Sequence, residues 1–264
     1  MVSEATVPVG AVGLSARRIS RPALIPVVSV VAGLVLWEVV ARVWQVSFFP
    51  PASSVLVRMA ELLLGGKAAP LLLASMADLL IAFVFLAVVG VVVGLLMGIF
   101  WRVDGALLPF VTALLAAPVI VFAPVFFAVF GFSRITVQAI IVVHCVFVII
   151  SNVRDGARSV RADQAEMARL FGANWWQHAV FVVLPASMPL AAAGLRIGFG
   201  RAVKGMINGE MFIAVVGLGG MLVSAGRVFD AEGVLAILGL TVLVALIGTS
   251  LLSLIERRLL HWYL

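Results

Sequence analysis

Long apolar tracts separated by short polar segments dominate the pattern of this chain. The tracts are much longer than a β-strand, which argues against a transmembrane β-barrel, whose strands alternate apolar and polar residues over about 10 positions. A helix needs about 20 apolar residues to cross a bilayer. We therefore predict an all-α membrane protein with about six transmembrane helices, at residues 22–43, 71–100, 107–130, 135–152, 186–216 and 233–256.

The composition supports a membrane protein. Of the 264 residues, 64% are hydrophobic and 11% are charged, whereas soluble domains contain about 25% charged residues. The mean hydropathy is +1.25. The net charge is +6, but the basic residues are scattered between the apolar tracts, so we expect no nucleic-acid partner. Membrane lipid is the expected surrounding of the chain.

The distribution of arginine and lysine predicts an orientation. The first apolar tract is too long for a signal-peptide core, so residues 1–21 are interpreted as a cytoplasmic tail and residues 22–264 as one transmembrane domain. The cytoplasmic side then receives most basic residues: Arg17, Arg18, Arg21, Arg102, Arg154, Arg158, Arg161, Arg169, Arg257 and Arg258. The outer side keeps Arg58, Lys67, Arg134 and Arg227. This bias agrees with the positive-inside rule.

The longest polar-rich segment lies between the fourth and fifth predicted spans. Asp163 with Glu166, and Asn174 with Gln177, have the spacing of capping boxes, so each pair predicts the start of a short helix. Gly172 lies between them and suits the left-handed conformation that ends a helix. The sequence therefore predicts a pair of short cytoplasmic helices joined by a bend.

Apolar side chains concentrate on this helix pair and predict a contact surface. They are Met167, Leu170, Phe171, Trp175 and Trp176. Glu166 and Arg169 are spaced to pair across one turn on a more polar face, and Pro185 predicts a break before the fifth span. The apolar surface can dock in the groove of a partner, pack on the protein's own helix ends, or lie on lipid headgroups.

Several charged residues fall inside predicted spans, where each costs about 2.5–3.5 kcal/mol to insert. The fifth tract contains Arg196, Arg201, Lys204 and Glu210, and is either one tilted helix or two shorter segments. These residues, with Asp78 of the second tract, either line a solute pathway or its gates, or pair to stabilise helix contacts, or extend their charged ends to the membrane surface from a helix end. For Glu38 of the first tract we expect structural pairing.

Glycine and proline positions predict further features of the spans. Gly90, Gly94 and Gly98 recur every four residues, so they lie on one helix face and favour close helix packing. Pro118 and Pro124 predict a kink or break in the third span, which is either a gate or a static bend.

No catalytic or cofactor site is predicted. Cys145 is the only cysteine, and its neighbour His144 has no further ligand-type residues at metal-binding spacing. Phosphate-binding and nucleophile motifs are absent, so the chain has no ATP site of its own and is not predicted to be an enzyme. Energy for transport must come from a partner or from an ion gradient.

The polar segment resembles the EAA loop of ABC importer permeases, in which Glu-Ala-Ala is followed by Gly and by Ile-x-Leu-Pro. The matching residues are Glu166, Ala168, Gly172, Leu184 and Pro185. About nine-tenths of the chain is similar to the nitrate, sulfonate and taurine type of permease. The segments that carry this similarity are "LWEVVARVW" (36–44), "FPPASSVL" (49–56), "APVIVFAPVFFAVFGFSR" (117–134) and "GLRIGFGRAVKGMINGEMF" (194–212).

Three positions depart from the family pattern. Met167 stands where the family usually has Ala and Val182 where it usually has Ile, and both remain apolar. Asp78 stands where relatives usually have Arg, which weakens any transfer of solute preference.

The resemblance implies that residues 161–185 form a coupling loop that fits a cleft in a cytoplasmic ATPase. The residues implied in coupling are Asp163, Glu166, Ala168, Arg169, Phe171, Gly172, Trp175, Trp176, Leu184 and Pro185. The implied partners are two ABC ATPase subunits, a second permease copy in a homodimer, and an extracytoplasmic solute-binding protein. The glycines at 217–220 are expected to form a turn before the outer loop with Arg227, Asp230 and Glu232, where that protein binds.

The implied protein is a multi-pass permease subunit of a bacterial plasma membrane that imports a small anionic solute such as a sulfonate, taurine or nitrate. Pyrimidine precursors and aromatic acids are also possible transported solutes for such a permease. The sequence leaves two alternative functions: a stand-alone secondary transporter or channel, and an intramembrane enzyme that uses His144, Asp78 or Glu210.

Overall fold

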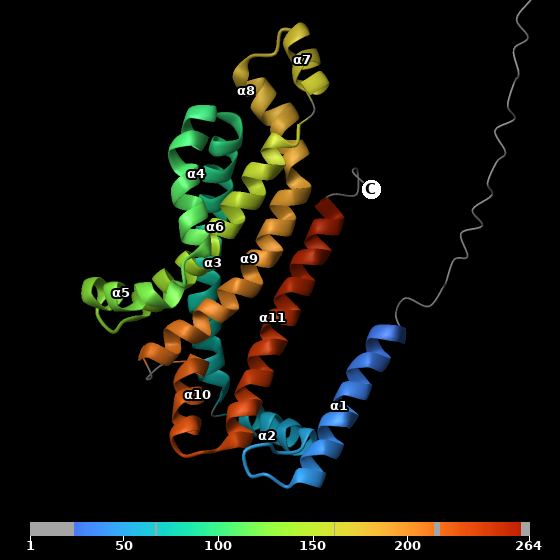
Figure 1. Cartoon of the computed structure of the whole chain (residues 1–264), viewed down its shortest axis with the longest axis vertical. Coiled ribbons are helices and arrows are strands. Elements are labelled where there is room, and N and C mark those ends of the chain that lie inside the picture. Colours follow the sequence, from blue (N-terminus) through green and yellow to red (C-terminus); the bar gives the residue numbers. More distant parts are fainter. Residues whose placement is uncertain (1–23, 67, 161, 214–216, 260–264) are drawn as a thin grey trace, which may run out of the picture.

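The computed structural model describes residues 24–66, 68–160, 162–213 and 217–259. The predicted cytoplasmic tail, residues 1–21, lies outside these ranges. Every regular element in the described ranges is helical, as expected for an all-α membrane protein. Figure 1 shows long helices running between two ends of the molecule, with short helices placed at each end.

The elements follow one another in an order that matches the predicted tracts. The long helices are α1 (Leu24–Trp44), α3 (Ala68–Ile99), α6 (Arg134–Arg158), α9 (Leu184–Ile213) and α11 (Ala231–Leu259). Between them lie α2 (Ala52–Leu64), α4 (Trp101–Ala116), η1 (Val119–Phe122), α5 (Ala123–Phe130), α7 (Ala162–Leu170), α8 (Trp175–His178), η2 (Ala179–Val183) and α10 (Gly217–Arg227). The short helices α2 and α10 were not predicted from the sequence.

The described helices include 5 that are long and apolar enough to cross a membrane, or up to 6 if one bent pair counts as a span. This confirms the prediction of about six. The bent pair is α4 with η1 and α5, which turn by 101° relative to each other. The expected span at residues 107–130 is wrong at its start, because the helical segment begins at Trp101.

Proline explains the break in the third span. Ala117, directly before Pro118, leaves the helical region with φ −69° and ψ 138°, and α4 ends there. A proline ring disfavours the helical conformation of the preceding residue and supplies no amide donor. Pro124 lies in the first turn of α5, where the missing donor is tolerated. The predicted kink or break at Pro118 and Pro124 is thus confirmed at Pro118.

The fifth span is one continuous helix, which resolves the alternative left open by the sequence. The helical run extends from Trp175 to Ile213, so the predicted break before Pro185 is wrong. The chain forms a π-helical turn, η2, immediately before Leu184 and Pro185. Proline removes one hydrogen bond of the α-helical ladder, and a widened π turn accommodates that loss without ending the helix.

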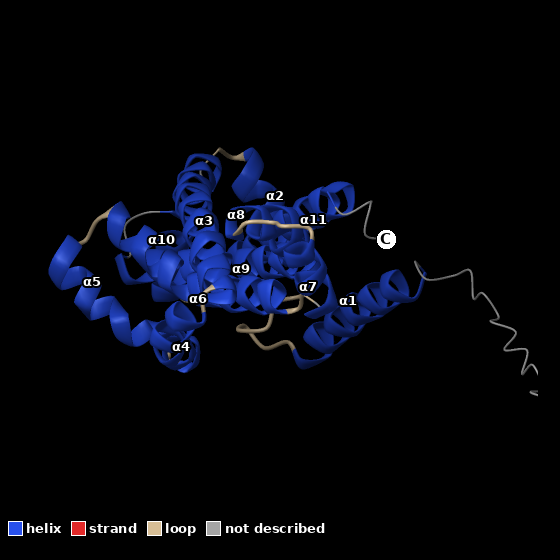
Figure 2. Cartoon of the chain, turned by 90° about the horizontal axis from the view of Figure 1, so that it is seen from above, coloured by secondary structure: helices blue, strands red, loops and turns tan. Residues whose placement is uncertain are grey.

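Glycine contacts fix the centre of the bundle, where α6 packs against both α3 and α9; Figure 2 shows these three helices side by side. A Cβ atom at Gly98 would lie 2.2 Å from the Cβ atom of Ala157, and Gly90 and Gly94 face α6 in the same way. The predicted packing role of these glycines is confirmed. Close helix approach at small residues is a common way for membrane helices to associate.

Helix α1 stands away from the bundle and is joined to it through α2 (Figure 1). The Glu38 carboxylate accepts a 2.7 Å hydrogen bond from Arg42 Nε and a 3.0 Å bond from the backbone amide of Ser53 at the start of α2. The expected structural pairing of Glu38 is confirmed, and it fixes the angle between the two helices.

Candidate functional site

The short helices α7 and α8 form a hairpin at one end of the molecule, beyond the ends of the long helices (Figure 1). Asn174 caps α8: its side chain accepts a 2.8 Å hydrogen bond from the Gln177 amide, and the Gln177 side chain accepts a 2.8 Å bond from the Asn174 amide. The predicted second capping box is confirmed. It satisfies orphan amides at the start of α8.

The bend between the two helices depends on Gly172. This residue has φ +78°, in the left-handed region that favours glycine. The amide of Ala173 donates to the carbonyl of Ala168 over 3.0 Å, which closes the six-residue hydrogen-bonded ring that typically ends a helix before a left-handed glycine. The predicted helix, bend and helix are confirmed, and Ala168 contributes its backbone to the bend.

The start of α7 differs from the prediction. The helix begins at Ala162, so Asp163 lies in its first turn and does not precede it. The Asp163 carboxylate accepts a 3.0 Å hydrogen bond from the neighbouring Gln164 amide. A carboxylate in the first turn still interacts favourably with the positive end of the helix dipole. Glu166 is exposed one turn later, while the side chain of its predicted partner Arg169 lies outside the described set.

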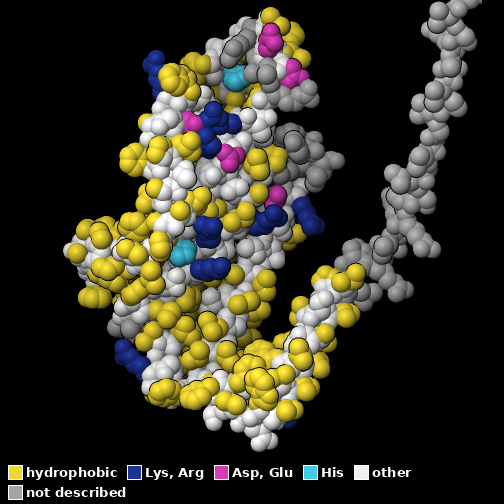
Figure 3. Space-filling model, viewed as in Figure 1, with side chains coloured by type: hydrophobic (Ala, Val, Ile, Leu, Met, Phe, Trp, Pro, Cys, Tyr) yellow, Lys and Arg dark blue, Asp and Glu magenta, His cyan; other side chains and the backbone are white. Residues whose placement is uncertain are grey.

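Large apolar side chains on this hairpin face outward. Leu170 is 82% exposed, Phe171 85% and Trp175 65%, and Met167 and Trp176 are also exposed. Trp175 forms ring contacts with Phe100 and Trp176, so the indoles have fixed positions on the surface. Figure 3 shows hydrophobic and acidic side chains together at this end. We call Met167, Leu170, Phe171, Trp175 and Trp176 the apical surface.

A groove of about 440 Å³ separates α7 from the first part of the fifth span. Met167, Ala168 and Phe171 line it from the hairpin, and Phe181 and Pro185 line it from the other wall. Leu184, directly before Pro185, is the first residue of α9 and does not line the groove. The predicted coupling residues therefore come together around one hairpin and one groove.

The predicted pathway residues divide into two sets. Arg196 pairs with Glu256 of α11 over 3.2 Å. Asp78 and Glu210 are 4% and 1% exposed, with Asp78 accepting a 3.0 Å hydrogen bond from Gln138 of α6. These positions favour the alternative in which polar side chains stabilise helix contacts.

Glu210 has a specific partner at the start of α10. Its carboxylate accepts a 2.8 Å hydrogen bond from the Gly219 amide, and Ser75 accepts a 3.0 Å bond from the Leu218 amide. The segment expected to form a turn at 217–220 is instead the first turn of α10. These side chains satisfy amides that the start of a helix leaves unpaired.

Arg201 and Lys204 form the second set. Both are exposed on α9 and lie on the same side of the helix as Ile197, which is also exposed. His144 of α6 packs against α9 at Gly205, the residue after Lys204. Figure 3 shows basic side chains and a histidine gathered at mid-height on this face.

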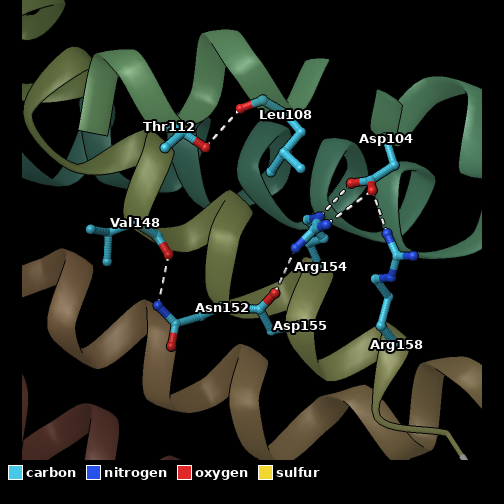
Figure 4. Close-up of polar contacts among 8 residues, drawn as sticks. All are labelled: Asp104, Leu108, Thr112, Val148, Asn152, Arg154, Asp155 and Arg158. Carbon is cyan, nitrogen blue, oxygen red and sulfur yellow. Dashed lines mark hydrogen bonds and ion pairs between the residues drawn. The ribbon is translucent and has the colours of Figure 1, made fainter. Parts of the chain in front are cut away.

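Asp104 of α4 belongs to an ion-pair network that sequence reasoning missed. Its carboxylate accepts a 2.9 Å hydrogen bond from Arg154 and a further bond from Arg158, both on α6 (Figure 4). Arg154 also bonds Asp155 over 2.9 Å. The sequence signal was a carboxylate close to the predicted cytoplasmic arginines, and it did not reveal which helices would meet.

The opposite end of the molecule carries a smaller charged cluster. Arg58 of α2 bonds Glu61 over 3.2 Å and Asp230, just before α11, over 3.3 Å. These hydrogen bonds, that to Glu61 first, raise the pKa of Arg58. Asp230 in turn accepts a 2.8 Å bond from the Gly233 amide. The predicted outer-loop residues Arg227, Asp230 and Glu232 therefore lie at the end away from the apical surface.

Within the described ranges, no three histidine, cysteine, aspartate or glutamate side chains gather in an arrangement that could hold a metal ion. Cys145 is buried in α6 with its thiol directed at the Ile141 carbonyl. The distinctive features of the chain are the exposed apical surface and the exposed cations of α9.

Comparison with known proteins agrees with this arrangement. Residues 87–261 match the family model described as binding-protein-dependent transport system inner membrane component. The chain is 31% identical over 245 residues to the formylaminopyrimidine transport permease protein ThiX of Halalkalibacterium halodurans, covering 92% of this chain and 97% of the relative. It is 28% identical over 253 residues to the taurine transport system permease protein TauC of Escherichia coli, covering 93% and 92%.

A third relative is the nitrate import permease protein NrtB of a Synechocystis species, 27% identical over 203 residues and covering 74% of each chain. The family match extends from the middle of α3 to the end of α11 and includes the α7–α8 hairpin. The chain therefore belongs to the family of binding-protein-dependent transport system inner membrane components, the permease subunits of ABC importers.

Proposed function

We propose that this permease couples solute import to ATP hydrolysis by docking its α7–α8 hairpin in a cleft of a cytoplasmic ABC ATPase. The observation that carries the proposal is the apical surface, in which Leu170 and Phe171 are more than four-fifths exposed. Exposed apolar patches of this kind mark interaction sites. Two ATPase subunits, one for each permease copy, would cover them.

The hairpin is built to pass a displacement into the membrane. Helix α8 continues through η2 into α9, so a shift of Trp175 moves the fifth span directly. On the other side, α7 follows α6 after residues 159–161, and α6 packs along α9 through Gly194, Gly198 and Gly205. Movement of the hairpin is therefore delivered to α6 and α9 together.

The proposed solute pathway lies between two copies of the chain, because one copy leaves the Arg201 and Lys204 face uncovered. The relatives with taurine and nitrate in their names support a small anionic solute. The Arg58 and Asp230 end is proposed to face an extracytoplasmic solute-binding protein.

The distribution of arginine supports an orientation in a bacterial plasma membrane. The apical end carries Arg102, Arg154, Arg158, Arg257 and Arg258, which supports a cytoplasmic hairpin and N-terminus.

The test is co-purification of the tagged chain from native membranes in mild detergent, with mass spectrometry and an ATPase assay of the bound proteins. We expect an ABC ATPase with the wild type and its loss in Phe171→Asp. Val228→Asp is the matched control, because Val228 is also exposed and apolar but lies at the opposite end. Recovery of the ATPase with Phe171→Asp, or its absence from the wild type, contradicts the proposal.

A further inference from the structure

Helix α9 carries an exposed stripe along the middle of its length. Its members recur every three or four residues and so share one helix face: Ile197, Arg201, Lys204, Asn208 and Met211. Asn208 is half-buried and the others are exposed. At 1.5 Å per residue, Arg201 lies about 25 Å from the start of α9 and about 18 Å from its end. Both cations therefore fall within a hydrocarbon core about 30 Å thick.

The two cations have no counter-charge in the described part of the chain. Neither Arg201 nor Lys204 takes part in an ion pair with a described carboxylate, whereas Arg196 on the same helix is paired with Glu256. A lone cation in the hydrocarbon core is unfavourable by at least a few kcal/mol, and such residues face a bundle interior or a water-filled cavity. The stripe therefore does not face lipid.

A histidine from a second helix completes the cluster. His144 lies near the middle of α6 and is half-buried beside Gly205, where an added Cβ atom would lie 3.0 Å from the His144 Cβ atom. The Nδ1 atom of His144 has no hydrogen-bond partner among the described residues. His144 thus packs behind the stripe, within about one turn of both cations, and its Nδ1 atom is buried.

We propose that Arg201 and Lys204, with His144 packed behind them, form an anion-binding site for a small oxoanion, such as a sulfonate or nitrate group, at the midpoint of the solute pathway. The inference rests on the proposed function, since a second copy must close the pathway over the stripe. Facing copies bring Arg201 and Lys204 of each into one water-filled space, where a bound anion offsets their repulsion. Guanidinium binds planar oxoanions through paired hydrogen bonds, and ammonium adds a point charge.

Thiol chemistry tests the site, because the single native cysteine is easily removed. Buried Cys145 is replaced by alanine, and Asn208, one turn from Lys204 on the same stripe, by cysteine in the full chain, which is purified with whatever subunits accompany it and reconstituted in liposomes. Charged methanethiosulfonate reagents modify only a thiol that water reaches as thiolate. We expect the anionic reagent to react about ten-fold faster than the cationic one, because Arg201 concentrates anions.

Protection by small solutes identifies the ligand class. Methanesulfonate and nitrate are expected to slow modification of Asn208→Cys in a concentration-dependent way. Dimethyl sulfone, an uncharged molecule of nearly the same shape as methanesulfonate, is expected to have no effect. If the two reagents react at equal rates and no solute protects the thiol, the anion-binding site is overturned. The reaction itself would still show that water reaches this face of α9.

Three controls separate the possible failures. Val84→Cys, exposed near the middle of α3 among apolar side chains, should not react because it faces lipid. Adding Arg201→Gln should bring the anionic-to-cationic rate ratio close to one, whereas Arg134→Gln at the start of α6 should not change it. An Asn208→Cys protein that stays unreactive in every nucleotide state overturns the inference. Absence of an ATPase subunit would contradict only the proposed function, since labelling does not require ATP.

Discussion

The carboxylate of Asp104 on α4 accepts a 2.9 Å hydrogen bond from the guanidinium of Arg154 on α6, close to the end of α6 from which the α7–α8 hairpin begins. Arg158 bonds the same carboxylate. Because the contact joins the first turn of α4 to the last turns of α6, it fixes the base on which the hairpin stands. This network is the main polar contact between the broken third span and the bundle.

Asp104→Asn is expected to destabilise this end of the protein. The substitution leaves two arginines without their carboxylate, and breaking a fully buried ion pair costs about 3–5 kcal/mol. Arg158 is 47% exposed, so solvent screening lowers our expectation to about 2 kcal/mol. Unfolding in mixed detergent micelles measures the change. Asp155→Asn removes an exposed partner of Arg154 and should cost less than about 1 kcal/mol; equal losses in the two variants contradict the assignment.

Gly172→Ala is expected to weaken coupling without disturbing the spans. The glycine has φ +78°, and no heavy atom lies within 4 Å of an added Cβ, so the cost is conformational and about 1–2 kcal/mol. We expect ATP hydrolysis to continue while less solute is transported per ATP, and Gly172→Pro to abolish coupling. The matched control is Gly105→Ala in α4, which also has open space but normal helical geometry. Unchanged transport per ATP in both Gly172 variants would reject the role of the bend.

Glu166→Lys is expected to reduce transport per ATP because it reverses the charge of an exposed residue at the proposed ATPase contact. Glu166→Gln separates charge reversal from charge loss and should have the smaller effect. Both are measured in proteoliposomes as solute uptake per phosphate released. Thermal stability should stay within about 0.5 kcal/mol of the wild type, as for most surface substitutions. Normal coupling of the lysine variant would place Glu166 outside the contact.

Gly98→Val is expected to force α3 and α6 apart. A Cβ atom at residue 98 would lie 2.2 Å from the Ala157 Cβ atom and 3.2 Å from the Arg154 carbonyl oxygen. Overpacking of this kind costs about 1–3 kcal/mol. The yield of monodisperse protein in detergent and its unfolding midpoint report the loss. Gly105→Val on the open side of α4 is the comparison, and an equal loss there would show that backbone propensity, not helix contact, decides the effect.

Glu210→Gln is expected to behave nearly as the wild type in folding and transport, because the glutamine carbonyl can still accept the Gly219 amide. Glu210→Ala leaves that buried amide unpaired and should cost about 1–3 kcal/mol. Comparison of uptake and unfolding for the two variants distinguishes a helix anchor from a pathway residue. A transport defect in the glutamine variant at normal stability would return Glu210 to the pathway.

Much of the fold was predictable because it depends on local patterns. The apolar tracts predicted the long helices to within a few residues at most ends, since twenty apolar residues in a row have few other stable states in a bilayer. The capping box at Asn174 and the left-handed turn at Gly172 depend on neighbouring residues alone, so both were predicted. Pro185 misled the prediction because a π turn absorbs its missing hydrogen bond.

The charged residues of the fifth span show what the sequence alone determined and what required the tertiary structure. The sequence placed Arg196, Arg201, Lys204 and Glu210 in one apolar tract and showed that each needs a partner or water. It did not assign those partners, because the four lie in similar local surroundings. The packing of the helices decided these partners: the first turn of α10 covers Glu210, Glu256 of α11 pairs with Arg196, and the face with Arg201 and Lys204 stays exposed. Which side of a helix is buried depends on contacts between segments far apart in the chain.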